Sequence, residues 1–281
     1  MALIQAGSAK VVRKCSGFRV SYVDANSISL TPTPNGNYEG IVPVTNGTVG
    51  FDVVLNPSSA WNCSLATPGS GGLLTGYVRT NNTLYCLYLA YCSSTGEKAL
   101  FFAPYNVQVN LVVVASLTNN GSGTAFDFYS SCLGAVRNLV ATIVPFENPE
   151  PGKFLYLPSV TTDVQVLTTG VAIVNTAVNC TGLVPTYDYS GFFGRYLCEN
   201  TNAIAPTPDI YIFEYDGTNY VSRNEVDNID DLVGTWRTPS GIFKIGNGRG
   251  RSPVDVLNYR WTAAPSIGLT LQIHGFELQG F

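Results

Sequence analysis

The chain has 281 residues, of which 45% are hydrophobic and only 12% are charged. The charged share is about half of the usual quarter while the hydrophobic share is ordinary, which excludes a disordered polymer and predicts a folded chain with a real core. A net charge of −4 and a pI near 5.0 disfavour a nucleic-acid-binding surface, which needs clustered Lys and Arg.

The N-terminal part of the chain predicts strands. Residues 17–24, 27–31 and 51–55 alternate apolar side chains with polar ones, and this period of two is typical of strands that bury one face. Residues 84–92 are apolar at nearly every position. They predict a central strand that is covered on both faces.

The middle of the chain carries the first helical signal. Residues 106–117 place valine, leucine and alanine on one face and asparagine and glutamine on the other, which predicts another strand. Residues 131–140 begin with Ser131, a good helix N-cap, and their apolar residues fall at helical spacing, so they predict a short helix. Residues 227–233 begin with Asp227 and predict a second short helix.

The C-terminal part returns to the strand pattern. Residues 164–174 are apolar on both faces and predict a central strand with a bulge at Gly170. Residues 209–215 and 218–222 flank an Asp-Gly pair, which is a strong hairpin signal. Residues 268–278 predict a final strand whose leucine and isoleucine side chains form one inward row.

Short strands with turn residues between them predict an all-β chain, folded as a single large β-barrel or sandwich. The chain is longer than one simple sandwich, so long decorated loops and one or two short helices take up the rest. Because no flexible linker interrupts the pattern, we expect residues 1–281 to form one β-rich domain. No apolar run reaches membrane-spanning length and the N-terminus lacks a signal-peptide pattern, so we expect neither membrane insertion nor a signal peptide.

Seven cysteines occur without C-x-x-C spacing, which disfavours zinc and dithiol redox motifs. Cys180 and Cys198 flank a segment rich in Gly and Tyr and are the best candidates for a disulfide. The alternative is that all seven side chains are buried thiols, which the usual burial of cysteine favours.

Catalytic signals are weak. A Ser–His–Asp or Cys–His site would have to use His274, the single histidine, which lies on the polar face of the last predicted strand. Glu225 and Asp227 belong to an acidic capped turn that indicates a solvated loop rather than a glycosidase pair. Phosphate-loop, dinucleotide and G-x-S-x-G motifs are missing from the sequence. We therefore expect no enzymatic activity, no cofactor and no metal site.

Residues 186–196 suit carbohydrate binding better. They contain Tyr187 and Tyr189 beside Asp188 and Arg195, and their glycines predict a loop. A sugar needs an aromatic platform for its apolar face, with charged or amide side chains nearby for its hydroxyls. The alternative is that these aromatic side chains pack beneath the loop or form a dimer contact.

A basic loop at 247–251 is the second candidate. It suits an acidic glycan or partner, or else it neutralises the acidic turn at 225–231. The residues predicted to bind a receptor or ligand are therefore Tyr187, Asp188, Tyr189, Arg195, Arg249 and Arg251.

An all-β chain that is poor in charge, rich in Asn, Thr, Gly and Tyr, and without a catalytic motif resembles the surface projections of non-enveloped viruses. In its size, composition and pattern of predicted strands, the whole chain resembles the spike domain of an astrovirus capsid protein. The resemblance implies a homodimeric spike on the virion surface, made in the host cytoplasm, which binds a host receptor or glycan and neutralising antibodies. The alternatives are a phage tail receptor-binding domain, which would be trimeric, and a secreted glycan-binding module.

Overall fold

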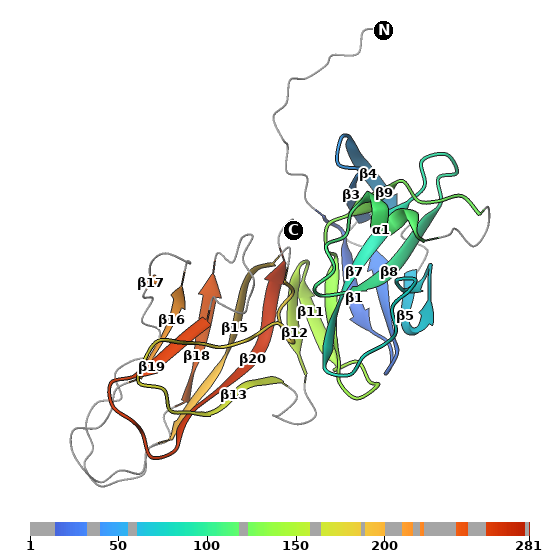
Figure 1. Cartoon of the computed structure of the whole chain (residues 1–281). Coiled ribbons are helices and arrows are strands. Elements are labelled where there is room, and N and C mark those ends of the chain that lie inside the picture. Colours follow the sequence, from blue (N-terminus) through green and yellow to red (C-terminus); the bar gives the residue numbers. More distant parts are fainter. Residues whose placement is uncertain are drawn as a thin grey trace.

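The computed structural model describes residues 15–32, 40–55, 61–117, 123–157, 164–186, 189–199, 210–215, 220–221, 240–246, 257–278 and 281. The all-β prediction is confirmed, because these residues form strands with one five-residue helix among them. The strands belong to three sheets (Figure 1). The prediction that residues 1–281 make one domain stays a prediction.

The first sheet contains ten strands of the described chain and curls on itself (Figure 1). Its pairs are antiparallel, except that β6 is parallel to both β5 and β8. The order across the sheet is β1 (Phe18–Tyr22), β2 (Ser27–Pro32), β5 (Trp61–Pro68), β6 (Gly72–Leu73), β8 (Lys98–Pro104), β7 (Thr83–Tyr91), β9 (Phe128–Ser130), β3 (Gly40–Thr45) and β4 (Gly50–Leu55), with β10 (Gly134–Asn138) paired to β7.

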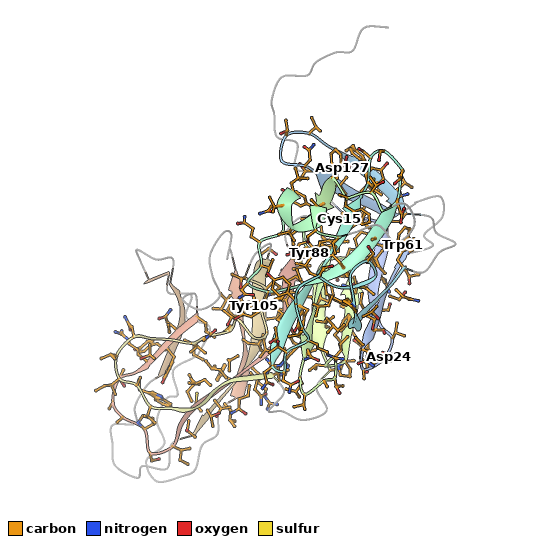
Figure 2. The ribbon with its side chains drawn as sticks, turned by 45° about the vertical axis from the view of Figure 1, so that its right-hand side comes forward. Cys15, Asp24, Trp61, Tyr88, Tyr105 and Asp127 are labelled. Carbon is orange, nitrogen blue, oxygen red and sulfur yellow. The ribbon has the colours of Figure 1, made fainter. Side chains whose placement is uncertain are left out.

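The strand β7 confirms the prediction of a central strand that is covered on both faces. All seven residues from 84 to 90 are buried, and β7 pairs with β8, β9 and β10. Tyr88 stacks on Phe101 of β8 with 5.6 Å between the ring centroids. Figure 2 shows Tyr88 among packed side chains, with Asp24 and Asp127 near opposite ends of this part of the molecule.

The second sheet has six strands in the part of the chain that the structure describes. Its order is β11 (Phe146–Glu150), β12 (Lys153–Tyr156), β20 (Gly268–Leu278), β15 (Tyr189–Glu199) and β18 (Ser240–Gly246), and β13 (Gln165–Gly170) also pairs with β20. The final strand is confirmed as predicted, since β20 buries Leu269, Leu271 and Ile273 in one row. Because β12 and β13 pair with different halves of β20, while β15 runs along its whole length, β20 organises this sheet.

The third sheet has the order β14 (Thr176–Ala177), β19 (Leu257–Trp261), β16 (Ile210–Tyr215) and β17 (Tyr220–Val221). The predicted hairpin is confirmed, because β16 and β17 pair antiparallel. Trp261 joins this sheet to the second one: its backbone N–H donates to the Ala172 carbonyl at 2.9 Å, and its indole Nε1 donates to the Gly170 carbonyl at 2.8 Å. A buried tryptophan with a satisfied N–H therefore fixes the two sheets together.

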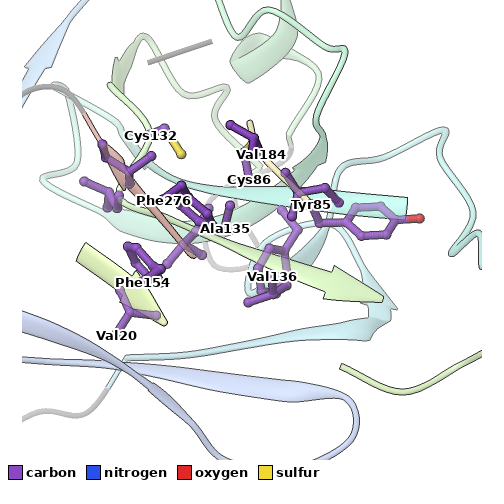
Figure 3. Packing of buried hydrophobic residues seen from close by; sticks show 14 of the residues in the cluster. Val20, Tyr85, Cys86, Cys132, Ala135, Val136, Phe154, Val184 and Phe276 are labelled. Atoms are coloured by element: carbon purple, nitrogen blue, oxygen red, sulfur yellow. The ribbon is translucent and has the colours of Figure 1, made fainter. Parts of the chain in front are cut away.

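Aromatic side chains join the first sheet to the second. Within the second sheet, Phe154 of β12 stacks on Phe276 of β20, with centroids 5.1 Å apart and ring planes at 10°. Phe146 of β11 meets Tyr22 of β1 edge-on at 6.5 Å. Figure 3 shows Phe154 and Phe276 packed with buried side chains of both sheets, Val20 among them. One hydrophobic cluster therefore extends across the sheets.

The prediction of a strand over residues 106–117 is wrong. Residues Leu111–Ala115 form α1, and the side chain of Asn110 accepts a hydrogen bond from the Val113 backbone N–H at 3.1 Å. An asparagine N-cap satisfies one of the donors that a helix start leaves open. Val114 is the buried residue of this helix, and Leu117, just after the helix, is also fully buried, so the segment packs one apolar side against the core despite its β-branched composition.

The prediction of a helix over residues 131–140 is wrong too. Residues Gly134–Asn138 form β10, which pairs with β7 from Gly134 opposite Leu87 to Asn138 opposite Thr83. The edge of β7 offers a full row of backbone partners, and the consecutive apolar residues Ala135 and Val136 are both buried there. Long-range pairing therefore overrides the local capping signal.

Residues 164–174 do not form a strand that is central and doubly covered. The strand β13 covers only 165–170, pairs only with β20 among the described strands, and exposes Thr168 and Thr169. The register shifts between Leu167 and Gly170, as the predicted bulge requires. Beyond it, residues 171–175 leave the sheet instead of continuing the ladder. The helix predicted at 227–233 lies outside the described residues.

The cysteines are buried thiols. Cys180 and Cys198 are both buried and separate, so the best candidate disulfide is not formed. The Cys180 thiol instead donates to the Val178 carbonyl, two residues earlier. No helix in the described ranges is both long enough and apolar enough to cross a membrane.

Candidate functional site

The structure places two of the six residues predicted to bind a ligand. Tyr189 is the first residue of β15, and Arg195 lies in the middle of the same strand with an exposed side chain. The other four predicted residues lie outside the described residues: Tyr187, Asp188, Arg249 and Arg251.

The loop predicted for residues 186–196 is wrong from Tyr189 onward. The strand β15 pairs with β18 on one side and with β20 on the other. Backbone pairing on both edges outweighs the weak strand propensity of Gly191 and Gly194. Arg195 is therefore held on a paired central strand rather than on a loop.

The two faces of β15 differ sharply. Phe192, Tyr196 and Cys198 are buried on the inner face. Successive side chains of a strand point to opposite faces, so Phe193 and Arg195 belong to the outer face. Phe193 is partly buried and Arg195 is exposed. Among the described residues of this strand, the outer face leaves the Arg195 side chain exposed.

Strand register places Arg195 in a row of polar side chains. Arg195 lies directly opposite Gln272 of β20, and Gln272 lies directly opposite Gln165 of β13. Directly opposite residues of antiparallel strands share one face, with Cβ atoms about 4.5–5.5 Å apart. The Gln165 amide also donates to the Thr168 hydroxyl, which orients it. A guanidinium and two amides thus lie side by side across three strands.

His274 stands next to this row at a β-bulge. Phe193 pairs with Gly275 and Gly194 with Ile273, which leaves His274 as the extra residue of β20. Its side chain is exposed. Partial burial, and then the positive charge of Arg195, lower the pKa of His274 from its ordinary value. The lowered pKa favours the neutral imidazole, in which one nitrogen is a donor and the other an acceptor.

Phe193 lies against the backbone of β20. A Cβ atom added at Gly275 would come within 2.6 Å of the Phe193 ring and within 2.1 Å of the Phe154 carbonyl oxygen. Only glycine fits beneath this ring. An aromatic side chain is thereby fixed on the same face as Arg195, two residues earlier in the strand.

We call this surface the β15–β20 face. An aromatic ring can pack on the apolar side of a sugar, and amide, imidazole and guanidinium groups can bind hydroxyl or carboxylate oxygens. No group of three or more His, Cys, Asp or Glu side chains within the described ranges is arranged to hold a metal ion. The β15–β20 face consists of Gln165, Phe193, Arg195, Gln272 and His274.

Sequence reasoning found Arg195 but missed Gln165 and Gln272. Alternation along residues 268–278 did place Gln272 and His274 on a polar face. Which residue of another strand lies opposite them depends on register, and the bulge at His274 changes that register within one strand.

Comparison with known proteins gives no family. A scan of protein-family models gives no match for this chain, and a search of curated proteins gives no match either.

Proposed function

We propose that this chain is a surface projection of a non-enveloped virus particle, similar to an astrovirus capsid spike, and that it attaches the particle to host cells by binding a glycan. It acts by binding, without an enzymatic step or a cofactor. The observation that carries the proposal is the row of Arg195, Gln272 and Gln165 beside the ring of Phe193 on one open sheet face.

The β15–β20 face favours a glycan because its side chains match the two kinds of surface that a sugar has. The Phe193 ring offers apolar contact, and the neighbouring amides offer both donors and acceptors for hydroxyl groups. The whole chain carries only 15 Lys and Arg residues in 281 and has a net charge of −4, so its contacts depend on uncharged groups more than on charge. Weak binding at one such face is multiplied when many copies are displayed on one particle.

The cysteines favour a particle protein over a secreted module. All seven are buried thiols, and disulfides are the usual state of cysteine pairs in secreted domains. Burial raises the pKa of Cys198 to about 12, and burial raises the pKa of Cys63 and Cys180 as well. Since the thiolate is the reactive form, these three thiols are protected from oxidation in the folded state.

Oligomeric state separates the spike from the phage alternative. A spike of this kind is a homodimer that buries at least about 1,000 Å², whereas a phage tail domain would be a trimer. Sedimentation of the purified chain at high concentration should show a dimer. A trimer would favour the phage tail, and a strict monomer would contradict both assemblies.

Attachment is tested by displaying the chain at high density on beads and measuring binding to a glycan array and to cultured cells. We expect binding that falls when cell-surface glycans are removed enzymatically. We also expect Arg195→Ala beads to lose binding, and beads carrying Arg19→Ala to keep it. Arg19 is a matched control because it is an exposed arginine on β1 of the first sheet. Beads that bind no glycan would contradict the proposal.

A further inference from the structure

We infer that one end of the first sheet is the contact surface between two copies of this chain. Three loops form this end, 23–26, 77–82 and 139–142, and Figure 2 marks it with Asp24. We call it the loop end. The inference rests on the proposed function, because it names the contact surface of the expected homodimer, which the proposed function leaves open.

Arg79 holds the three loops together. Its Nε donates to Asn138 Oδ1 at 2.7 Å, and its Nη2 donates to the Ala25 carbonyl at 3.0 Å. Its Nη1 donates to the side-chain oxygen of Asn26. Because these bonds fix the loops before any partner arrives, docking loses little conformational entropy at this surface.

Two further hydrogen bonds fix the loop that follows β10. The Asn138 side chain, which accepts from Arg79, also donates through Nδ2 to the Thr80 carbonyl at 2.7 Å. The backbone N–H of Ala141 donates to Asn81 Oδ1 at 3.1 Å. The loops 77–82 and 139–142 therefore keep one position relative to each other.

Large apolar side chains are exposed around this network. Val78 is 80% exposed and Val140 is 69% exposed, while the exposed fractions of Val23 and Tyr77 are 52% and 42%. Each of the four lies within two residues of a group that takes part in the hydrogen bonds of Arg79 or Asn81. Apolar side chains that gather on a fixed surface indicate an interaction site, whereas single exposed ones do not.

The charges of the loop end favour a second copy as its occupant. Asp24 and Arg79 are the charged residues of these three loops. The bonds of Arg79 go to neutral oxygens and use three of its five N–H donors, and no acidic side chain in the part of the chain that the structure describes forms an ion pair with it. In a two-fold contact, Arg79 of each copy can meet Asp24 of the other. A purely acidic or basic partner would meet a like charge.

The other exposed apolar segment offers no such argument. Val171, Ile173 and Val174 are 48%, 56% and 67% exposed. Residues 171–175 carry no charged side chain, so nothing there selects an occupant. This segment serves as the alternative interface in the experiment.

The experiment measures the dissociation constant of the full-length dimer by sedimentation equilibrium over a range of concentrations. Val78→Asp should raise this constant about a hundredfold, because it places an unpaired charge in an apolar contact. Val112→Asp is the matched control, since Val112 of α1 is also a valine with 80% exposure, and it should leave the constant unchanged. Circular dichroism verifies that these variants of exposed side chains fold.

Exchange of charges tests the pairing of Asp24 with Arg79 directly. Asp24→Lys should raise the dissociation constant about tenfold, because like charges then face each other in both halves of the contact. A mixture of Asp24→Lys and Arg79→Glu chains should form a heterodimer, since both pairs then have opposite signs. Asp24→Lys alone keeps the pairing testable if Arg79→Glu does not fold, because Asp24 bonds the Asn26 backbone and not Arg79.

Failure of this inference differs from failure of the proposed function. A dimer that withstands Val78→Asp and Asp24→Lys, or one that is broken by Ile173→Asp instead, would overturn the inference and leave the homodimeric spike standing. A wild type that stays monomeric at every concentration, or forms a trimer, would overturn both.

Discussion

The strands β7 and β15 are both central in their sheets, but they present opposite surfaces. Residues 84–90 of β7 are buried on both faces, whereas β15 buries Phe192, Tyr196 and Cys198 on one face and exposes Arg195 on the other. Both strands have backbone partners on each edge. A central position in a sheet therefore does not decide whether a strand can bind a ligand. What decides this is whether other parts of the protein cover the faces of the strand.

This difference suggests that β7 contributes mainly to stability and β15 mainly to binding. The apolar side chains of β7 contribute stability through burial, which scales with the apolar area removed from water. The exposed side chain of Arg195 on β15 contributes little burial and can vary with little cost to the fold. Substitutions in the two strands should accordingly change different measurements.

The largest effect is expected at Leu89 of β7. Leu89→Ala should lower the free energy of unfolding by about 2–5 kcal/mol, because the fully buried side chain leaves a cavity. Leu157→Ala is the matched control, since Leu157 is 45% exposed, and it should cost less than about 1 kcal/mol. Urea unfolding of both variants measures the difference. Equal losses would contradict the role of burial in the stability of β7.

A smaller effect is expected where the first two sheets meet. A Cβ added at Gly134 of β10 would lie 2.9 Å from the Phe154 ring and 3.3 Å from Val20, so Gly134→Ala should destabilise the fold by about 1–3 kcal/mol. The Phe154 ring cannot move away freely because it stacks on Phe276.

Gly40→Ala is the control for this glycine. A Cβ there would meet its nearest atoms at 3.4 Å, an ordinary contact distance, so little change in the denaturation midpoint is expected. If both alanine variants were as stable as the wild type, the junction would be looser than its aromatic packing implies.

The smallest effect concerns the dependence of stability on pH. The folded state lowers the pKa of His274, so below about pH 6.5 the unfolded chain takes up a proton more readily than the folded chain. Stability is therefore fully present above pH 6.5 and falls as the pH drops through the folded pKa. His274→Gln should show a smaller fall in melting temperature between pH 7 and pH 5 than the wild type.

Arg195→Gln separates the two causes of the lowered His274 pKa by the same measurement. It removes the positive charge that is the second cause of the lowered pKa, and leaves the first cause, burial, in place. Its fall in melting temperature should lie between those of the wild type and His274→Gln. A fall as large as that of the wild type would mean that Arg195 does not act on His274.

Period-two patterns predicted the strands that bury one face well. The row of Leu269, Leu271 and Ile273 in β20 and the hairpin of β16 and β17 followed from the sequence. The predictions failed at residues 106–117 and 131–140, where one Asn cap and one strand edge reversed the expected structures. At residues 106–117 the alternation was the clearest in the chain, yet the Asn110 cap and the buried Val114 favoured a helix. At residues 131–140 pairing with the distant strand β7 decided the structure.

The candidate site shows the same limit. The sequence contains the residue types of the site, and the aromatic and charged residues of 186–196 predict Arg195 as a binding residue. The segment was expected to be a loop because glycines weaken strands, yet β18 and β20 pair with it on both edges. The sequence could not show those edges, since pairing partners lie more than forty residues away along the chain.

By itself the sequence determined the all-β class, the charge-poor exterior and the side chains available for binding, because composition and alternation are local properties. Only the tertiary structure decided that Arg195, Gln272 and Gln165 share one face beside Phe193. That arrangement depends on the register of three strands and on one bulge at His274, and a shift of one residue would turn each of these side chains to the opposite face.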